Sequence, residues 1–219
     1  MTGLSPAAVL RGLAVGLLVV AWALLAHYGI AGDAPLDLAA ALATAPIVAL
    51  VVILLWRVGN PLWIALGGLA ILVLLALSWP SLRDNVTLLY YLQHVGTNLA
   101  LGALFGRSLL GDQDSLVTQF AKLAHDGVIS PAKARYTRQV TIAWSLFFFA
   151  SAAVSTALFW LAPAAAWSVF ANLLGLPLLA LMFIGEHLIR HRVLAPDDCS
   201  SIADTIRGYR ASAARRAER

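Results

Sequence analysis

Residues 38–56 read LAAALATAPIVALVVILLW, residues 62–79 read LWIALGGLAILVLLALSW, and only RVGNP, residues 57–61, stands between them. Neither apolar run contains an Asp, Glu, Lys or Arg residue. A helix of roughly 20 apolar residues crosses the hydrocarbon core of a bilayer. Pro61 suits the first turn of a helix, where no backbone N–H is needed. The two runs therefore predict a hairpin of transmembrane helices.

Apolar runs of similar length lie on both sides of this hairpin. Hydrophobic residues make up 61% of the 219 residues and charged residues 12%, whereas a soluble domain has roughly 25% charged residues. One soluble core of this size cannot bury so much apolar surface. The expected fold class is all-α, a polytopic membrane helix bundle. Apolar continuity places about six transmembrane helices at about 12–30, 38–56, 62–79, 86–105, 140–161 and 165–189.

The positive charges predict the orientation of these helices. With the N-terminus in the cytoplasm, 14 of the 15 Lys and Arg residues fall in cytoplasmic segments, and only Arg83 falls outside. The outer segments hold Asp33, Asp37 and Asp84 instead. Because Lys and Arg resist translocation, we expect a multi-pass protein of the bacterial inner membrane with both termini in the cytoplasm. This topology accounts for the net charge of +4, and no nucleic-acid partner is expected.

The predicted domains are a transmembrane domain, residues 1–192, and a basic cytoplasmic tail, residues 193–219, which is expected to contact anionic lipid. The first apolar run is expected to be a retained anchor rather than a signal peptide, because no small-x-small cleavage site follows it. Tryptophans near the ends of the spans, Trp167 among them, are expected at the headgroup boundary.

A short amphipathic helix is predicted within residues 112–127, on the cytoplasmic face of the membrane. Gly127 should end it, and Ser130 with Pro131 forms a pair suited to the N-cap and first turn of the next helix. The apolar residues of the segment recur at helical spacing: Leu116, Val117, Phe120 and Leu123.

The fourth span carries an unusual group of polar side chains, which should face the bundle interior because polar groups in lipid are costly. Tyr91, His94 and Asn98 share one helical face by their spacing. The candidate intramembrane site is Tyr90, Tyr91, Gln93, His94, Thr97 and Asn98. It is either a binding or proton-handling site or a set of interhelical hydrogen bonds. The second is favoured, because no carboxylate lies near the histidine in sequence. Gly102 and Gly106 predict close helix packing.

The end of the sixth span holds two pairs of residues four apart. Glu186 and Arg190 predict an ion pair at the cytoplasmic boundary. His187 and His191 have a chelating spacing, but no convincing third ligand accompanies them, so neither a metal nor a cofactor is expected. The G-x-S-x-G elbow, the phosphate-binding glycine loop, HExxH and a Cys–His dyad are missing, and no catalytic residue is assigned.

Three runs carry a family resemblance: YYLQHVGTNLALGALFGRSLL (90–110), KARYTRQVTIAWSLFFF (133–149) and WSVFANLLGLPLLALMFIGEHLIRHRV (167–193). They resemble an uncharacterised bacterial membrane-protein family that is encoded in aryl-polyene and xanthomonadin-like pigment clusters and often labelled "ketosynthase". The resemblance covers roughly the last half of the chain. It implies a role in making, moving or attaching a polyene acyl group at the inner membrane. Soluble biosynthetic enzymes or an acyl carrier protein would be the partners.

The label can be tested against the residues. A ketosynthase uses a nucleophilic cysteine served by basic residues in a soluble core, whereas the only cysteine here, Cys199, lies in the polar tail beside Asp197 and Asp198. Literal ketosynthase activity is therefore rejected. The favoured hypothesis is a non-catalytic scaffold or lipid-handling component of the pathway. The alternatives are a small transporter or flippase, and an intramembrane acyl-transfer enzyme that uses His94.

Overall fold

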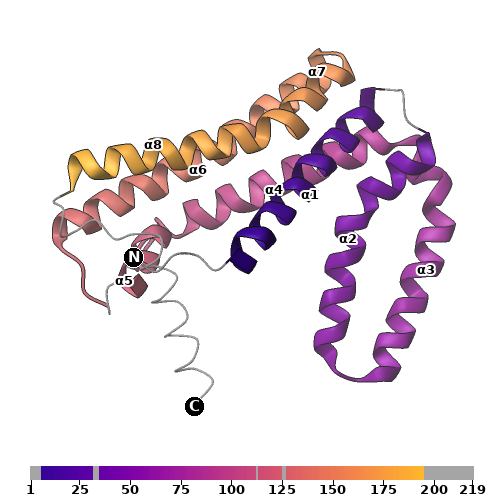
Figure 1. The fold of residues 1–219 in the computed structure, drawn as a ribbon, viewed down its shortest axis with the longest axis horizontal. Coiled ribbons are helices and arrows are strands. Elements are labelled where there is room, and N and C mark those ends of the chain that lie inside the picture. The colour runs from indigo at the N-terminus through magenta and orange to yellow at the C-terminus, as the bar shows by residue number, and fades with distance from the viewer. Residues whose placement is uncertain (1–5, 32–34, 112, 125–126, 195–219) are drawn as a thin grey trace. The chain divides into compact units, whose positions relative to one another are not determined.

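The computed structural model describes residues 6–31, 35–111, 113–124 and 127–194. Every regular element among them is helical (Figure 1), which confirms the all-α fold class. The elements are α1 (Pro6–Ala31), α2 (Leu36–Val58), α3 (Pro61–Asp84), α4 (Val86–Arg107), α5 (Leu116–Ala124), α6 (Pro131–Leu161), α7 (Ala164–Ser168), the π-helical segment η1 (Val169–Leu174) and α8 (Gly175–Val193). The predicted tail lies outside the described residues from position 195 onward, and so does Cys199.

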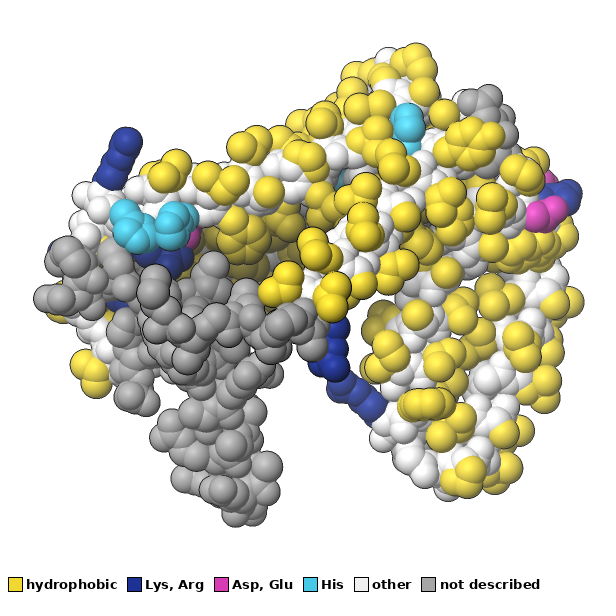
Figure 2. All heavy atoms as spheres, in the orientation of Figure 1, with side chains coloured by type: hydrophobic (Ala, Val, Ile, Leu, Met, Phe, Trp, Pro, Cys, Tyr) yellow, Lys and Arg dark blue, Asp and Glu magenta, His cyan; other side chains and the backbone are white. Residues whose placement is uncertain are grey.

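Helical stretches long and apolar enough to cross a membrane confirm the polytopic membrane character. In the described part of the chain there are five: Val9–Ala31, Leu36–Arg57, Pro61–Asp84, Pro131–Leu161 and Ala164–Val193. The fourth predicted span is also one continuous helix, α4, whose 22 residues measure about 33 Å. Because polar side chains reduce its apolar content, the crossing of the membrane by α4 stays a prediction. Hydrophobic side chains are spread over the visible described surface (Figure 2), as contact with lipid requires.

The hairpin that joins α2 to α3 has the predicted turn chemistry. Gly59 adopts a positive φ of 72° after α2, and the side chain of Asn60 accepts the N–H of Leu62 at the start of α3. The helix does not end near residue 79, where the predicted span ends, but continues to Asp84. Apolar continuity reports the part of a helix that lies in lipid, whereas backbone hydrogen bonding can continue beyond it.

By its contacts the chain divides into two compact units. Unit 1 comprises Met1–His94 and Ser155–Leu176, and unit 2 comprises Val95–Val154 and Pro177–Arg219. The core of unit 1 is built on small side chains, which allow helices to approach closely. A Cβ placed on Gly29 of α1 would lie only 3.1 Å from the Cβ of Ala39 on α2. The buried core residues of unit 1 are Ala26, Ile30, Ala39, Ala40, Ala43, Val86, Tyr90 and Trp167.

The core of unit 2 is aromatic and joins α4 to α6. The predicted packing at the glycine pair of α4 is confirmed. A Cβ on Gly102 would lie 3.1 Å from the ring of Phe149, and the hydroxyl of Ser145 donates to the Gly102 carbonyl across 3.0 Å. The buried residues of this core are Tyr136, Val140, Trp144, Phe148 and Leu194.

Candidate functional site

In unit 1, the first half of α4 is hydrogen-bonded to helices on two sides. The hydroxyl of Tyr91 donates to Oγ1 of Thr156 on α6 across 3.2 Å, and its ring stacks on that of Phe159 at 4.0 Å. The amide nitrogen of Gln93 donates to the carbonyl of Ala43 on α2 across 2.9 Å. Two polar residues of the predicted stripe therefore connect α4 to its neighbours.

His94, the third such residue, lies against a serine. Its Nδ1 is 3.0 Å from Oγ of Ser155 on α6, and the indole N–H of Trp167 on α7 donates to the same oxygen across 2.9 Å. Ser155 and Trp167 are fully buried. The imidazole and the ring of Phe170 are in a T-shaped arrangement, with 5.9 Å between ring centroids. One serine hydroxyl thus links helices α4, α6 and α7.

A second histidine repeats this arrangement. Nδ1 of His27 on α1 lies 3.0 Å from Oγ of Ser168, and the side-chain amide of Asn172 donates to that oxygen across 3.0 Å. Ser168 is fully buried. We name the two groups together the histidine–serine cluster; its members are His27, His94, Ser155, Trp167, Ser168 and Asn172.

The cluster adjoins η1, the π-helical segment Val169–Leu174. Trp167 and Ser168 come directly before it, and Asn172 lies within it. A π turn contains an additional residue and so changes which residues share a face, and such turns are frequent at functional sites. The π-helical turn thus coincides with the part of the last span that contributes Trp167, Ser168 and Asn172 to the cluster.

The other residues of the predicted stripe lie in different surroundings. Tyr90 is buried among the small side chains of unit 1, and its hydroxyl has no hydrogen-bond partner among the described residues. Thr97 is exposed and Asn98 is half-buried, and both belong to unit 2. Of the predicted stripe, Tyr90, Tyr91, Gln93 and His94 therefore belong to unit 1.

The remaining cluster members were missed from the sequence. The bonded residues lie far apart in the sequence: Ser155 is 61 residues from His94, and Ser168 is 141 residues from His27. The available signal was the presence of serine and asparagine inside apolar spans, since such side chains seek partners there. Trp167 was expected to face headgroups. It is buried instead because its indole N–H has a partner inside the unit.

A serine beside a histidine invites comparison with a nucleophile and its base. In a catalytic triad, a carboxylate binds Nδ1 and Nε2 serves the nucleophile. Here a serine oxygen lies at each Nδ1, and it also accepts an N–H from Trp167 or Asn172. A fully buried oxygen that already accepts a hydrogen bond is poorly placed to attack a substrate. This geometry is suited to holding helices together.

In unit 2, α6 and α8 meet at a half-buried ion pair. Arg190 binds both carboxylate oxygens of Glu186, and the hydroxyl of Tyr136 donates to Oε1 of Glu186 across 3.1 Å. The rings of His187 and His191 lie with centroids 4.3 Å apart, and Nδ1 of His191 is 2.8 Å from the His187 carbonyl. The group holds the polar ends of two long helices together.

No protein-family model, curated protein or solved structure matches this chain. The resemblance to the pigment-cluster family therefore stays an expectation drawn from the three runs quoted above. The function of the protein has to be argued from its own residues.

Proposed function

We propose that the protein is a non-catalytic component of the bacterial inner membrane, a scaffold or lipid-handling subunit in an aryl-polyene-type pathway. The observation that carries this proposal is the engagement of the α4 stripe in interhelical bonds. Tyr91, Gln93 and His94 each bond to a side chain or carbonyl of another helix. These hydrogen bonds account for the presence of the three polar side chains without a catalytic role, since buried polar groups need hydrogen bonds in any membrane bundle.

The charges at the ends of the helices support a topology with both termini in the cytoplasm. Arg83, the one cation of the predicted outer segments, lies 3.8 Å from Asp37 and 3.9 Å from Asp84. The indole N–H of Trp79 also donates to Asp37. Carboxylates thus offset the charge of the cation that this topology places on the translocated side. Acidic residues are tolerated on that side because Asp and Glu have little influence on membrane topology.

The predicted cytoplasmic ends of the helices are basic. Their exposed arginines are Arg11 and Arg57 in unit 1 and Arg107, Arg135, Arg138 and Arg192 in unit 2. The carboxylates of Asp114 and Glu186 are paired with Lys122 and Arg190. A face with surplus guanidinium groups attracts acidic molecules, and we propose that these include acyl carrier protein or the soluble enzymes of the pathway.

The direct test replaces His94 by Asn, whose amide can occupy the place of Nδ1 and keep a hydrogen bond to Ser155. His94→Asn removes the imidazole needed for acid–base chemistry. The expected result is that deletion cells complemented with this variant make product in proportion to the amount of protein in the membrane. An abundant, folded His94→Asn protein that makes no product would overturn the non-catalytic assignment.

The scaffold role has a separate test. The tagged protein, extracted from membranes in a mild detergent, should co-purify with acyl carrier protein or condensing enzymes. Replacing Arg135 and Arg192 together by Gln should weaken that association, whereas replacing Arg83 by Gln should not. A protein that always purifies alone would contradict the scaffold role. Product that is made but retained in the inner membrane of deletion cells would indicate transport instead.

A further inference from the structure

Helix α5 is attached to α6 by hydroxyl groups. Oγ1 of Thr118 lies 2.7 Å from Oγ of Ser115 and 2.7 Å from Oγ1 of Thr137 on α6. Thr141, one turn further along α6, donates to Ser115 across 3.1 Å. All four side chains are buried. The contact between the two helices therefore runs through the polar side of α5.

This attachment turns part of the apolar side of α5 outward. At about 100° per residue, Phe120 lies about 200° and Leu123 about 140° around the helix from Thr118. Phe120 is 48% exposed and Leu123 is 38% exposed, while Val117 packs against the core of unit 2. A helix held only by a soluble core would bury Phe120 and leave the hydroxyls in water. The reversed arrangement indicates a second apolar environment beside α5.

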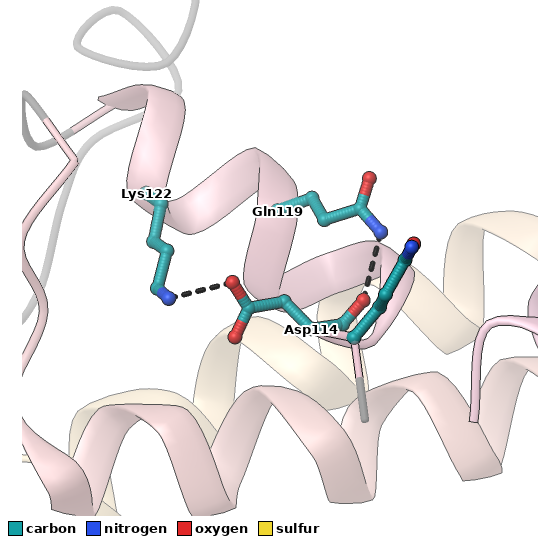
Figure 3. A pocket seen from close by; sticks show the side chains of 4 residues that line it. Asp114, Gln119 and Lys122 are labelled. Carbon is teal, nitrogen blue, oxygen red and sulfur yellow. Dashed lines mark hydrogen bonds and ion pairs between the residues drawn. The ribbon is translucent and has the colours of Figure 1, made fainter. Parts of the chain in front are cut away.

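The turns on either side of α5 also expose apolar side chains. Leu110 before the helix is 75% exposed, and Val128 after it is 79% exposed. Polar side chains of α5 and of the turn before it line a shallow hollow, with Lys122 paired to Asp114 (Figure 3). The residues that line this hollow are Gln113, Asp114, Gln119 and Lys122.

Two cations lie near Leu110, one of these exposed apolar residues. Nη2 of Arg138 donates to the carbonyl of Leu109 across 3.4 Å, which places a guanidinium group next to the exposed Leu110. Arg107, at the end of α4, is exposed. Helix α6 has 31 residues, about 46 Å of helix, whereas a hydrocarbon core of ~30 Å takes roughly 20 residues. About a third of α6 therefore extends beyond the hydrocarbon, and α5 binds that part.

We propose that this edge of unit 2, named here the α5 edge, lies in the cytoplasmic headgroup layer of the membrane that holds the protein and binds anionic phospholipid there. The α5 edge comprises Leu110, Phe120, Leu123 and Val128 with Arg107 and Arg138. The apolar side chains enter the boundary between headgroups and acyl chains, and the arginines bind phosphate. The inference uses the proposed topology but not the proposed pathway, so either can fail alone.

The test places a nitroxide label at single positions of the full-length protein in bilayer nanodiscs. In a Cys199→Ser background, labelled Phe120→Cys and Leu123→Cys are compared with Gln113→Cys, the matched control in the polar hollow. In phosphatidylcholine with 30% phosphatidylglycerol, labels at 120 and 123 should collide more with oxygen and several-fold less with a water-soluble nickel complex than the label at 113. Equal access to nickel at all three positions would overturn the proposal.

The effect of lipid charge is measured by hydrogen exchange on the protein without cysteine substitutions at the α5 edge. Hydrogen exchange of the α5 amides should slow when phosphatidylglycerol replaces part of the phosphatidylcholine. Arg138→Gln should reduce that effect by about fivefold, the preference expected for one cation at an anionic surface, and Arg192→Gln at the end of α8 should leave it unchanged. Exchange rates of the α5 amides that do not change with lipid charge would refute the preference for anionic lipid. Labels that become shielded only when a purified pathway protein is added would show a protein docking site and overturn the lipid assignment.

Discussion

Replacing Ser155 by Ala should destabilise the protein, although it removes a single oxygen atom. That oxygen lies 2.9 Å from the indole nitrogen of Trp167 and 3.0 Å from Nδ1 of His94, and Ser155 is fully buried. The substitution therefore removes two interhelical hydrogen bonds at once. It also leaves a buried N–H of Trp167 with no oxygen to receive it.

The magnitude follows from these contacts. Hydrogen bonds between transmembrane helices contribute about 0.6 kcal/mol each on average, so the two bonds account for about 1.2 kcal/mol. A buried donor left unsatisfied costs about 1–3 kcal/mol. These terms overlap, and we expect a loss of about 2 kcal/mol in the free energy of unfolding.

The assay is reversible unfolding in mixed micelles by sodium dodecyl sulfate, followed by the fluorescence of the seven tryptophans. The matched control is Ser78→Ala, because Ser78 lies on α3 and is exposed. In Trp167→Phe the donor is already absent, so adding Ser155→Ala should then cost about 1 kcal/mol less. The reasoning fails if Ser155→Ala and Ser78→Ala unfold at the same detergent fraction.

Two further substitutions use the same unfolding assay. Tyr90→Phe should raise the free energy of unfolding by about 1 kcal/mol, because it removes a buried hydroxyl that has no partner among the described residues; a loss of stability would show that the hydroxyl is bonded in the membrane. Gly102→Leu should cost about 2 kcal/mol, since even its Cβ would lie 3.1 Å from an aromatic ring of α6. Gly96→Leu, on the same helix with nothing within 4 Å of its Cβ, is the control and should be nearly neutral.

The helical spans could be predicted from the sequence because the requirement is local. A run such as 38–56 needs only its own composition to prefer lipid, and its backbone bonds are made within the segment. The turn at Gly59 and Asn60 was equally local. The ends of the helices were less predictable. α3 continues to Asp84, past the predicted span 62–79, because helical hydrogen bonding continues past the apolar part. The start of α6 at Pro131 was predicted from Ser130 and Pro131, and the hydroxyl of Ser130 accepts the N–H of Lys133.

The candidate site was predictable only in part. The spacing of Tyr91 and His94 along α4 predicted a shared polar face, and both side chains bond to α6. The partners could not be chosen from the sequence. Serines occur at several places in the spans, and nothing local distinguishes Ser155 or Ser168 as the residue that a histidine meets.

What the sequence by itself determined is the all-helical, membrane-spanning character of the chain and the residues of α4 that would need partners. Tertiary structure alone decided which partners they have, that His27 joins Ser168, and that α5 packs through Thr118 and turns Phe120 outward. The physical reason is that hydrophobicity and helical period act within one segment. A hydrogen bond between distant helices depends on how every segment of the unit packs.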